Sequence, residues 1–253
     1  MQTASPSSPR PRQPKQILLI GLPGCGKTGF TLTFPNPAII DADLNVDGAE
    51  RRLRITNKDL EYKYAALAFD EKGVVIPEDE RFVRMLRECE SAKTDPWVKT
   101  IIFDSLTMLH QYLIWQIQAA NKTDSMAIKE WGKHRGSMLS LLAKQRATGK
   151  TTIMICHRQE KTRKKKDNKG NDTLEEEVLG YLPSINPGLQ EDIGGMFTDI
   201  YHVTMKLKAG DQYENWIETM PTTMMPYLKN SIGLPPRLDV TKGFSALQPY
   251  WKD

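Results

Sequence analysis

The stretch that decides the fold of this chain is Gly21-Leu22-Pro23-Gly24-Cys25-Gly26-Lys27-Thr28. Its spacing, G-x-x-G-x-G-K-T, is that of a P-loop. An apolar run at residues 17–20 suits a buried strand before the loop, and residues 28–32 can open a helix after it. Glycines let the backbone curl so that its N–H groups point at phosphate oxygens, and the helix adds its positive N-terminal end. A chance glycine-rich turn is the alternative, but it would not need the strand, the helix and the Lys-Thr pair.

The P-loop pattern predicts a site for ATP and Mg²⁺. The residues expected to hold the nucleotide are Gly21, Gly24, Cys25, Gly26, Lys27 and Thr28. Lys27 is expected to reach the β- and γ-phosphates, where it also serves catalysis, and the Thr28 hydroxyl is expected to ligate Mg²⁺. Cys25 has two interpretations. We favour a small residue that fits the loop over a thiol whose pKa is lowered by the helix N-terminus.

Composition narrows the class of protein. The 253 residues suit one large α/β domain or a domain with extensions, and a hydrophobic content of 39% allows a core. A mean hydropathy of −0.49 and the lack of a long apolar run argue against a membrane span. Residues 1–14 are rich in Pro, Ser and Arg without a secretory h-region, so we expect a disordered tail. The cysteines at positions 25, 89 and 156 form no C-x-x-C pair, which favours a reducing cytoplasm.

Two further apolar runs end in aspartate. Residues 38–40 lead into Asp41-Ala42-Asp43, and residues 100–103 lead into Asp104-Ser105. A strand followed by Asp is the Walker B pattern, so Asp104 is expected to hold the water shell of Mg²⁺ beside Thr28. A helix cap formed by Asp104 or Ser105 is the alternative, and one residue can do both. Asp43 ends a different strand, from which its carboxylate is placed to polarise the attacking water.

The order of the remaining elements predicts an α/β fold with a mostly parallel sheet flanked by helices. A run at residues 151–156 ends in His157, which we expect to sense the γ-phosphate, although a lone histidine is usually structural. Apolar positions at helical spacing predict helices at residues 81–91, 107–120 and 127–147. Alternation at residues 199–207 and 213–220 predicts a hairpin, which would add antiparallel strands late in the chain.

This order of motifs resembles the RecA-like recombinase core. The run Ile40-Asp41-Ala42-Asp43 looks like that family's Ile-Asp-Ala-Glu, whose last carboxylate is the catalytic base, and Phe103-Asp104-Ser105 looks like its Val-Asp-Ser. Residues 229–235 resemble Lys-Asn-Lys-Ile-x-x-Pro, whose lysines reach the ATP of a neighbouring subunit. The resemblance therefore implies a catalytic role for Lys229 across an interface, while Ser231 replaces the second lysine.

The chain is most similar to phage-encoded, core-only RecA-like ATPases of the AAA-family nucleotide-binding group, which includes Sak-type single-strand annealing proteins. The resemblance implies an ATPase domain at residues 15–240 and a C-terminal tail at 241–253. It further implies ATP hydrolysis coupled to single-stranded DNA, assembly into a ring or filament of identical subunits, and possible contact with a single-strand binding protein. A phage-encoded protein would act in the bacterial cytosol, away from membranes. The strand before the sensor loop often ends in His in this group, which supports His157.

A basic run follows His157, inside a region at residues 158–195 that we expect to be a mobile loop. Its cations are Lys161, Arg163, Lys164, Lys165, Lys166 and Lys169. The resemblance places DNA contacts in this loop, where phosphates would order it. The alternative is a solvated loop neutralised by the acidic run at residues 175–177. The run contains no aromatic residue, and Tyr181 is the nearest candidate for base stacking.

Two other functions fit a P-loop. One is a small-molecule kinase, with the basic run as its lid, although lysines clamp phosphates less well than arginines. The other is a non-catalytic nucleotide switch in phage replication or packaging, which Asp43 in place of the family's Glu leaves open.

Overall fold

The protein is described from a computed structural model that covers residues 14–166, 172–208 and 213–251. In the order of their hydrogen bonding, the strands of its sheet are β3 (Lys63–Ala66), β2 (Pro37–Asp41), β4 (Thr100–Asp104), β5 (Thr151–Lys166), β1 (Gln16–Gly21), β7 (Asp199–Leu207), β8 (Tyr213–Glu218) and β9 (Arg237–Asp239). The strands from β3 to β7 pair in parallel, whereas β7–β8 and β8–β9 pair antiparallel. A mostly parallel sheet with late antiparallel strands confirms the predicted fold class.

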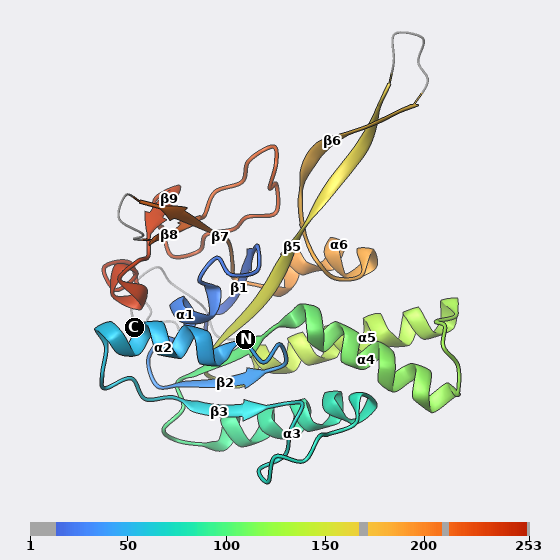
Figure 1. Ribbon diagram of the computed structural model, residues 1–253, viewed down its shortest axis with the longest axis horizontal. Helices are drawn as coiled ribbons and strands as arrows, with labels where there is room; N and C mark the ends of the chain where they lie inside the picture. Colours follow the sequence, from blue (N-terminus) through green and yellow to red (C-terminus); the bar gives the residue numbers. More distant parts are fainter. Residues whose placement is uncertain (1–13, 167–171, 209–212, 252–253) are drawn as a thin grey trace, which may run out of the picture.

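Helices cover both faces of the sheet (Figure 1). They are α1 (Lys27–Leu32), α2 (Val46–Thr56), α3 (Arg81–Thr94), α4 (Leu106–Asn121), α5 (Ile128–Arg146) and α6 (Pro187–Met196). Side chains alternate along a strand. Thus Leu18 and Ile20 of β1 pack in the cluster that contains α3, α4, α5 and α6, while Ile17 and Leu19 pack with α1. None of the helices within the described residues is long and apolar enough to cross a membrane.

The parallel strands bring the predicted site together. β1, β2, β4 and β5 run in the same direction, so their carboxyl ends meet at one edge of the sheet. The pairing puts Asp41 opposite Asp104 and Gly21 opposite His157. The P-loop and the residues that follow β2, β4 and β5 therefore lie next to one another although the sequence separates them.

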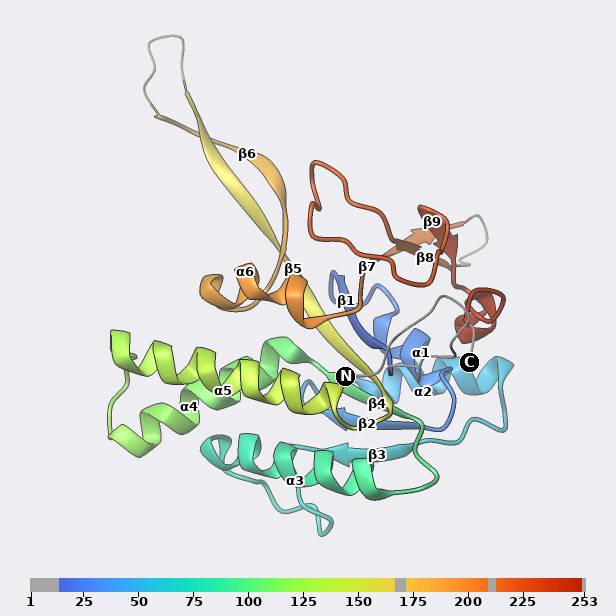
Figure 2. The ribbon, with the colours of Figure 1, turned by 180° about the vertical axis from the view of Figure 1, so that it is seen from behind.

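The prediction of a loop at residues 158–195 is wrong, because the described residues of this region form mainly strands and a helix. β5 continues to Lys166 and pairs antiparallel with β6 (Asp172–Pro183), and α6 follows. This hairpin projects from the body of the protein (Figures 1 and 2). Opposite charges explain why a polar run forms strands, because Arg163 pairs with Glu177 and Lys165 with Glu175, each at 2.9 Å across the two strands. Lys169 lies outside the described residues.

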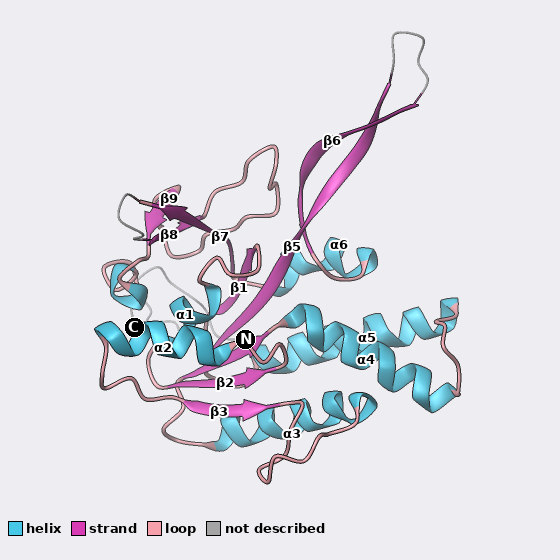
Figure 3. Ribbon diagram, in the orientation of Figure 1, coloured by secondary structure: helices cyan, strands magenta, loops and turns pink. Residues whose placement is uncertain are grey.

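The C-terminal segment is also not a tail within the described residues. Residues 243–246 form a 3-10 helix, which Figure 3 shows beside α1. Phe244 and Leu247 are buried, and the Phe244 ring lies 4.6 Å from that of Phe34, centroid to centroid. Trp251 packs against both rings. The hydrophobic contacts of this segment make it part of the domain, which the boundary predicted at residue 240 had excluded.

A pair of histidines between α4 and α5 predicts how stability depends on pH. His110 Nδ1 and His134 Nε2 lie 2.8 Å apart. Burial, followed by the proximity of His134, lowers the pKa of His110 to about 4, and burial also lowers the pKa of His134. The folded state therefore disfavours protonation of these two histidines. The stability that comes from keeping them neutral is complete above the ordinary pKa of about 6.5 and is lost as pH falls towards 4.

We therefore expect a His110→Gln protein to lose less stability on acidification than the wild type. The difference in slope should approach about 1.4 kcal/mol per pH unit below pH 6, which corresponds to one proton. Urea denaturation of both proteins between pH 7 and 5 measures it, with other titrating groups common to both. Parallel pH dependences would contradict the assignment.

Candidate active site

Glycines shape the P-loop between β1 and α1. Gly24 and Gly26 have φ angles of 75° and 88°, in the left-handed region that side chains disfavour. At Gly21 a Cβ atom would lie 2.6 Å from the carbonyl oxygen of Val203, so only glycine fits there. The loop adopts the curled backbone that the motif predicts.

The Lys27 side chain is folded into the loop. Only 5% of Lys27 is exposed, and its Nζ donates to the carbonyl oxygens of Gly21 at 3.0 Å and Leu22 at 2.7 Å. The ammonium group thus lies against the backbone of the loop. Bound phosphates would compete with these two carbonyl oxygens for its N–H donors. Neighbouring Cys25 is buried, and burial raises the pKa of its thiol despite the nearby Lys27. Cys25 is a small buried residue, as favoured, and not an activated thiol.

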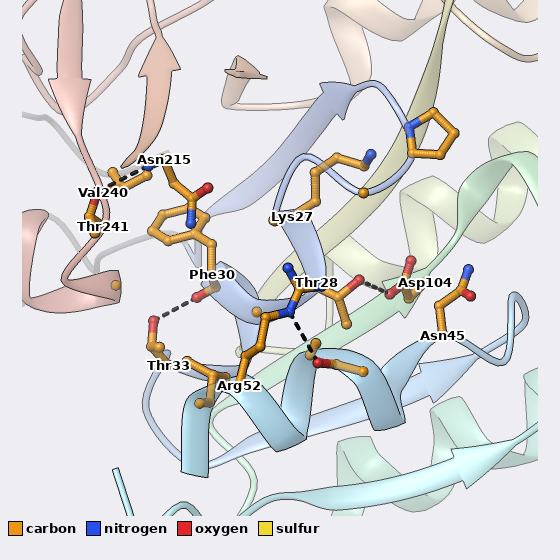
Figure 4. A pocket seen from close by; sticks show the side chains of 18 of the residues that line it. Lys27, Thr28, Phe30, Thr33, Asn45, Arg52, Asp104, Asn215, Val240 and Thr241 are labelled. Atoms are coloured by element: carbon orange, nitrogen blue, oxygen red, sulfur yellow. Dashed lines mark hydrogen bonds between the residues drawn. The ribbon is translucent and has the colours of Figure 1, made fainter. Parts of the chain in front are cut away.

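Thr28 and Asp104, the two residues predicted to hold Mg²⁺, are in direct contact. The Thr28 hydroxyl donates to Asp104 Oδ2 at 2.5 Å, which Figure 4 marks with a dashed line. Burial, together with the nearby carboxylates of Asp43 and Asp41, raises the pKa of Asp104 to about 7, although the Thr28 hydrogen bond and Lys27 act to lower it. A buried carboxylate among other carboxylates favours a nearby cation, so these residues fit Mg²⁺. When bound, Mg²⁺ would neutralise charge on the phosphates.

The helix cap that was the alternative role at this strand end belongs to Ser105. Its Oγ accepts from the Met108 N–H at 3.3 Å at the start of α4. Asp104 is thus left to face Thr28, and the two adjacent residues divide the two roles between them.

Asp43 is held between two partners. The Ser105 hydroxyl donates to Asp43 Oδ1 at 2.8 Å, and His157 Nε2 lies 2.9 Å from Asp43 Oδ2. Only 5% of the Asp43 side chain is exposed, against 25% for that of His157. The structure therefore joins the predicted base and the predicted sensor in direct contact. His157 Nδ1 is buried and has no hydrogen-bond partner among the described residues.

Asp41, which sequence reasoning left without a role, supports this arrangement. Its Oδ1 accepts from the backbone N–H groups of Asp43 at 3.1 Å and Leu44 at 2.8 Å. Asp41 thereby fixes the turn that presents Asp43 to the site.

These groups border a pocket of about 870 Å³. The P-loop, Asp43, Asp104 and His157 line one part of it. Sequence reasoning missed Arg52, Asn215 and Lys242, which are among the residues that line the rest. Arg52 lies in α2, the helix that comes directly after Asp43 in the sequence, so its place near the site could have been predicted. Asn215 and Lys242 come from the distant end of the sequence, and no motif marks them.

Lys229 is not brought to this pocket in its own chain. Its Nζ donates to the carbonyl oxygens of Gly194 at 3.3 Å and Phe197 at 2.9 Å, and its backbone bridges to Ile200 near the start of β7. Since β7 runs parallel to β1, this is the edge of the sheet opposite the P-loop. A role on the nucleotide of another subunit stays a prediction.

The basic residues of β5 lie outside the pocket. In the register of the hairpin, Arg163 and Lys164 face Glu177 and Glu176. Tyr181 at the base of the hairpin has the Arg158 guanidinium 3.8 Å from its ring centroid and is stacked with His202 at 6.1 Å. These contacts occupy the ring that had been the candidate for stacking on bases.

Comparison with known proteins supports the P-loop assignment. Residues 13–226 match the family described as AAA domain. The chain belongs to this family. P-loop ATPase families generally bind ATP with Mg²⁺. Membership of the AAA domain family therefore supports nucleotide binding at the P-loop of this chain.

Two further comparisons identify no specific function. No curated protein matches the AAA domain described here. Among solved structures, it is similar to a KaiC-like protein from the hyperthermophilic archaeon Pyrococcus horikoshii OT3, with 14% identity and a TM-score of 0.44 over 90% of this chain and 85% of that one. At this TM-score the likeness does not define fold or function, which rest on the strand order and the site geometry.

Proposed function

We propose that this protein is an ATPase whose activity responds to single-stranded DNA, as in phage-type recombination or strand annealing. The observation that carries the proposal is the convergence of Lys27, the Thr28–Asp104 pair and the Asp43–His157 pair on one pocket. This set contains a phosphate-binding lysine, a metal site and a carboxylate for water activation.

β5 supports the coupling to DNA. The same strand carries His157 beside Asp43 and then Lys161, Arg163, Lys164 and Lys165 in the projecting hairpin. Contact of these cations with DNA phosphates would act on the strand that holds His157. The glutamates of β6 reduce the net charge of the hairpin, so phosphates must compete with them for Arg163 and Lys165.

The proposal includes assembly of identical subunits in a ring or filament, with Lys229 reaching the nucleotide of a neighbour, in the bacterial cytosol. A single-strand binding protein would be a natural partner on the same DNA. These points rest on the resemblance of residues 229–235 and of the motif order to phage RecA-like ATPases.

The direct test is the rate of ATP hydrolysis with and without single-stranded DNA. Stimulation supports the proposal. Turnover that requires a small phosphoryl acceptor would identify a kinase instead, and nucleotide binding without turnover would identify a switch.

The hairpin makes a separate prediction about salt. If DNA phosphates contact it, binding releases counterions and weakens steeply as salt rises. Replacing Lys164, Lys165 and Lys166 by Ala should flatten the slope of log affinity against log salt by on the order of one unit or less per lost contact. Replacing Glu175, Glu176 and Glu177 by Gln should strengthen binding. Both are measured by salt titrations of oligonucleotide binding.

The matched control replaces three lysines of α5, at positions 129, 133 and 144, by Ala, which changes the net charge equally away from the hairpin. The hairpin variant should lose DNA stimulation of the ATPase and keep its DNA-free turnover. Equal affinities and slopes in all these proteins would show that the hairpin charges are merely solvated.

A further inference from the structure

We infer that Arg158, Tyr181 and His202 form a clamp at the root of the β5–β6 hairpin, and that through this clamp Arg158 and Tyr181 act as positioning residues for His157 during ATP hydrolysis. The inference rests on the proposed function, because it requires hydrolysis in the pocket that His157 lines. Neighbouring residues of a strand point to opposite faces, so Arg158 points away from that pocket. None of the three clamp residues lines the pocket, and their effect on hydrolysis would be indirect.

The strand that carries the predicted sensor changes partners at this point. His157 is the last residue of β5 that pairs with β1, and Arg158 is the first that pairs with β6. Farther out, residues 160–165 and 175–179 are all exposed, so burial against the domain is confined to the root of the hairpin that projects in Figure 1. Contacts at the root therefore decide the direction in which β5 leaves the sheet.

The orientation of the His157 ring depends on this root. Its Nε2 lies 2.9 Å from Asp43 Oδ2, while its Nδ1 is buried and has no hydrogen-bond partner among the described residues. The backbone N–H of His157 donates to Thr107 Oγ1 at 3.1 Å, and its carbonyl oxygen accepts from the Ser184 N–H at 2.8 Å. Ser184 follows β6 directly, so both Ser184 and the next residue, Arg158, move with the root of the hairpin.

Tyr181 is a fixed platform on β6. Its N–H donates to the Met224 carbonyl oxygen at 2.9 Å, and a Cβ atom on neighbouring Gly180 would lie 2.8 Å from the same oxygen. The Tyr181 ring is stacked on that of His202, with 6° between the planes and 6.1 Å between the centroids. His202 Nδ1 in turn lies 3.2 Å from Glu218 Oε2. These contacts tie the ring to β7 and β8, beside the P-loop strand.

Arg158 depends on this platform. Its guanidinium lies 3.8 Å from the centroid of the Tyr181 ring, whose π face attracts a cation. Only 14% of the Arg158 side chain is exposed, and its Nε is buried without a hydrogen-bond partner among the described residues. The NH2 nitrogen lies 3.9 Å from Glu160 Oε1, beyond hydrogen-bonding distance. The ring face is therefore the main contact that holds the guanidinium, and without the ring we expect this residue to leave its place beside His157.

The test measures kcat and KM for ATP in Tyr181→Leu and Tyr181→Phe proteins, with a saturating single-stranded oligonucleotide and without it. Leucine removes the ring, whereas phenylalanine keeps it together with the backbone contacts. We expect kcat to fall on the order of tenfold in Tyr181→Leu, because small displacements of catalytic groups have large effects on rate, while KM stays within about twofold. Tyr181→Phe should hydrolyse ATP as the wild type does.

A second measurement shows whether the effect passes through His157. In a His157→Asn background, Tyr181→Leu should lower kcat by less than about twofold more, because residues that act as a unit are not additive. A merely structural effect would lower kcat by the same factor in both backgrounds. If Tyr181→Leu fails to fold, Arg158→Met removes the guanidinium and provides the same comparison.

The outcomes separate this inference from the proposed function. Unchanged kcat in folded Tyr181→Leu and Arg158→Met proteins would overturn the inference, and so would an equal loss in Tyr181→Phe or a loss that multiplies with that of His157→Asn. In these cases the wild type still hydrolyses ATP. A wild type whose hydrolysis ignores DNA would refute the proposed coupling and leave the clamp intact. A wild type without ATP hydrolysis would refute the proposed function, and the inference with it.

Discussion

A Lys27→Ala protein is expected to fold normally and to lose ATP hydrolysis by a factor on the order of 10² to 10³, the usual cost of removing one donor that stabilises transition-state charge. The reason is the position of the ammonium group on the axis of the P-loop, within 3.0 Å of the Gly21 carbonyl oxygen. ATP affinity should fall as well, because the lysine contacts phosphates in the ground state. Calorimetry and a phosphate-release assay measure the two effects.

Stability distinguishes this result from misfolding. Removing Lys27 takes away a buried charge together with its hydrogen bonds to two loop carbonyls, so the melting temperature without nucleotide should change little. Lys93→Ala on α3 is the matched control, because the Lys93 side chain is 43% exposed and pairs with Glu90 on the surface of the same helix. ATP turnover at the wild-type rate in a folded Lys27→Ala protein would show that this loop is not the nucleotide site.

The phosphate end of the site follows from local sequence. Gly21, Gly24 and Gly26 are required by the backbone of the loop itself, and Asp104 and His157 follow apolar runs that form adjacent parallel strands. Strand direction then determines that these residues meet. For this reason the predicted fold class is confirmed and the polar groups of the phosphate end lie together.

The rest of the fold depends on contacts between distant segments. Runs of Lys and Glu have low β-propensity and resemble a loop, and they become strands here because Arg163 and Lys165 face glutamates across the hairpin. Phe244 becomes part of the core through Phe34, which is far away in sequence. Asn215 reaches the pocket because β8 pairs with β7 next to the P-loop strand. Alternation predicts the β7–β8 hairpin itself, but no local pattern marks its place beside β1 or the contact of Phe244 with Phe34.

The contact between Asp43 and His157 could not be predicted either, although each residue was a candidate. Both follow strand ends, but side-chain direction decides whether two such residues touch. Asp41 fixes the turn after β2 through two backbone N–H groups, and this orients Asp43 towards β5. The predicted base and sensor thus form one unit.

An Asp43→Asn protein is expected to bind ATP within about threefold of the wild type and to lose hydrolysis by a factor on the order of 10² to 10⁴, the usual contribution of general base catalysis. The amide is nearly the same size as the carboxylate, and its oxygen can still accept from Ser105, so the shape of the site is preserved. It lacks the negative charge that polarises a water and the basicity to take its proton. Single-turnover hydrolysis and equilibrium binding measure the two effects.

The contacts of Asp43 also identify His157 as the residue that could take the proton from water in its place. Both of its oxygens are engaged, by Ser105 and His157, so a water must either displace one partner or lie against the histidine that Asp43 orients. If His157 takes the proton, His157→Asn should lose as much hydrolysis as Asp43→Asn, and the double variant should lose little more, because residues that act as a unit are not additive. If Asp43 acts alone, His157→Asn should lose less. Asp47→Asn, in the first turn of α2, controls for the loss of one negative charge nearby. Hydrolysis at the wild-type rate in Asp43→Asn would show that this carboxylate is not the base.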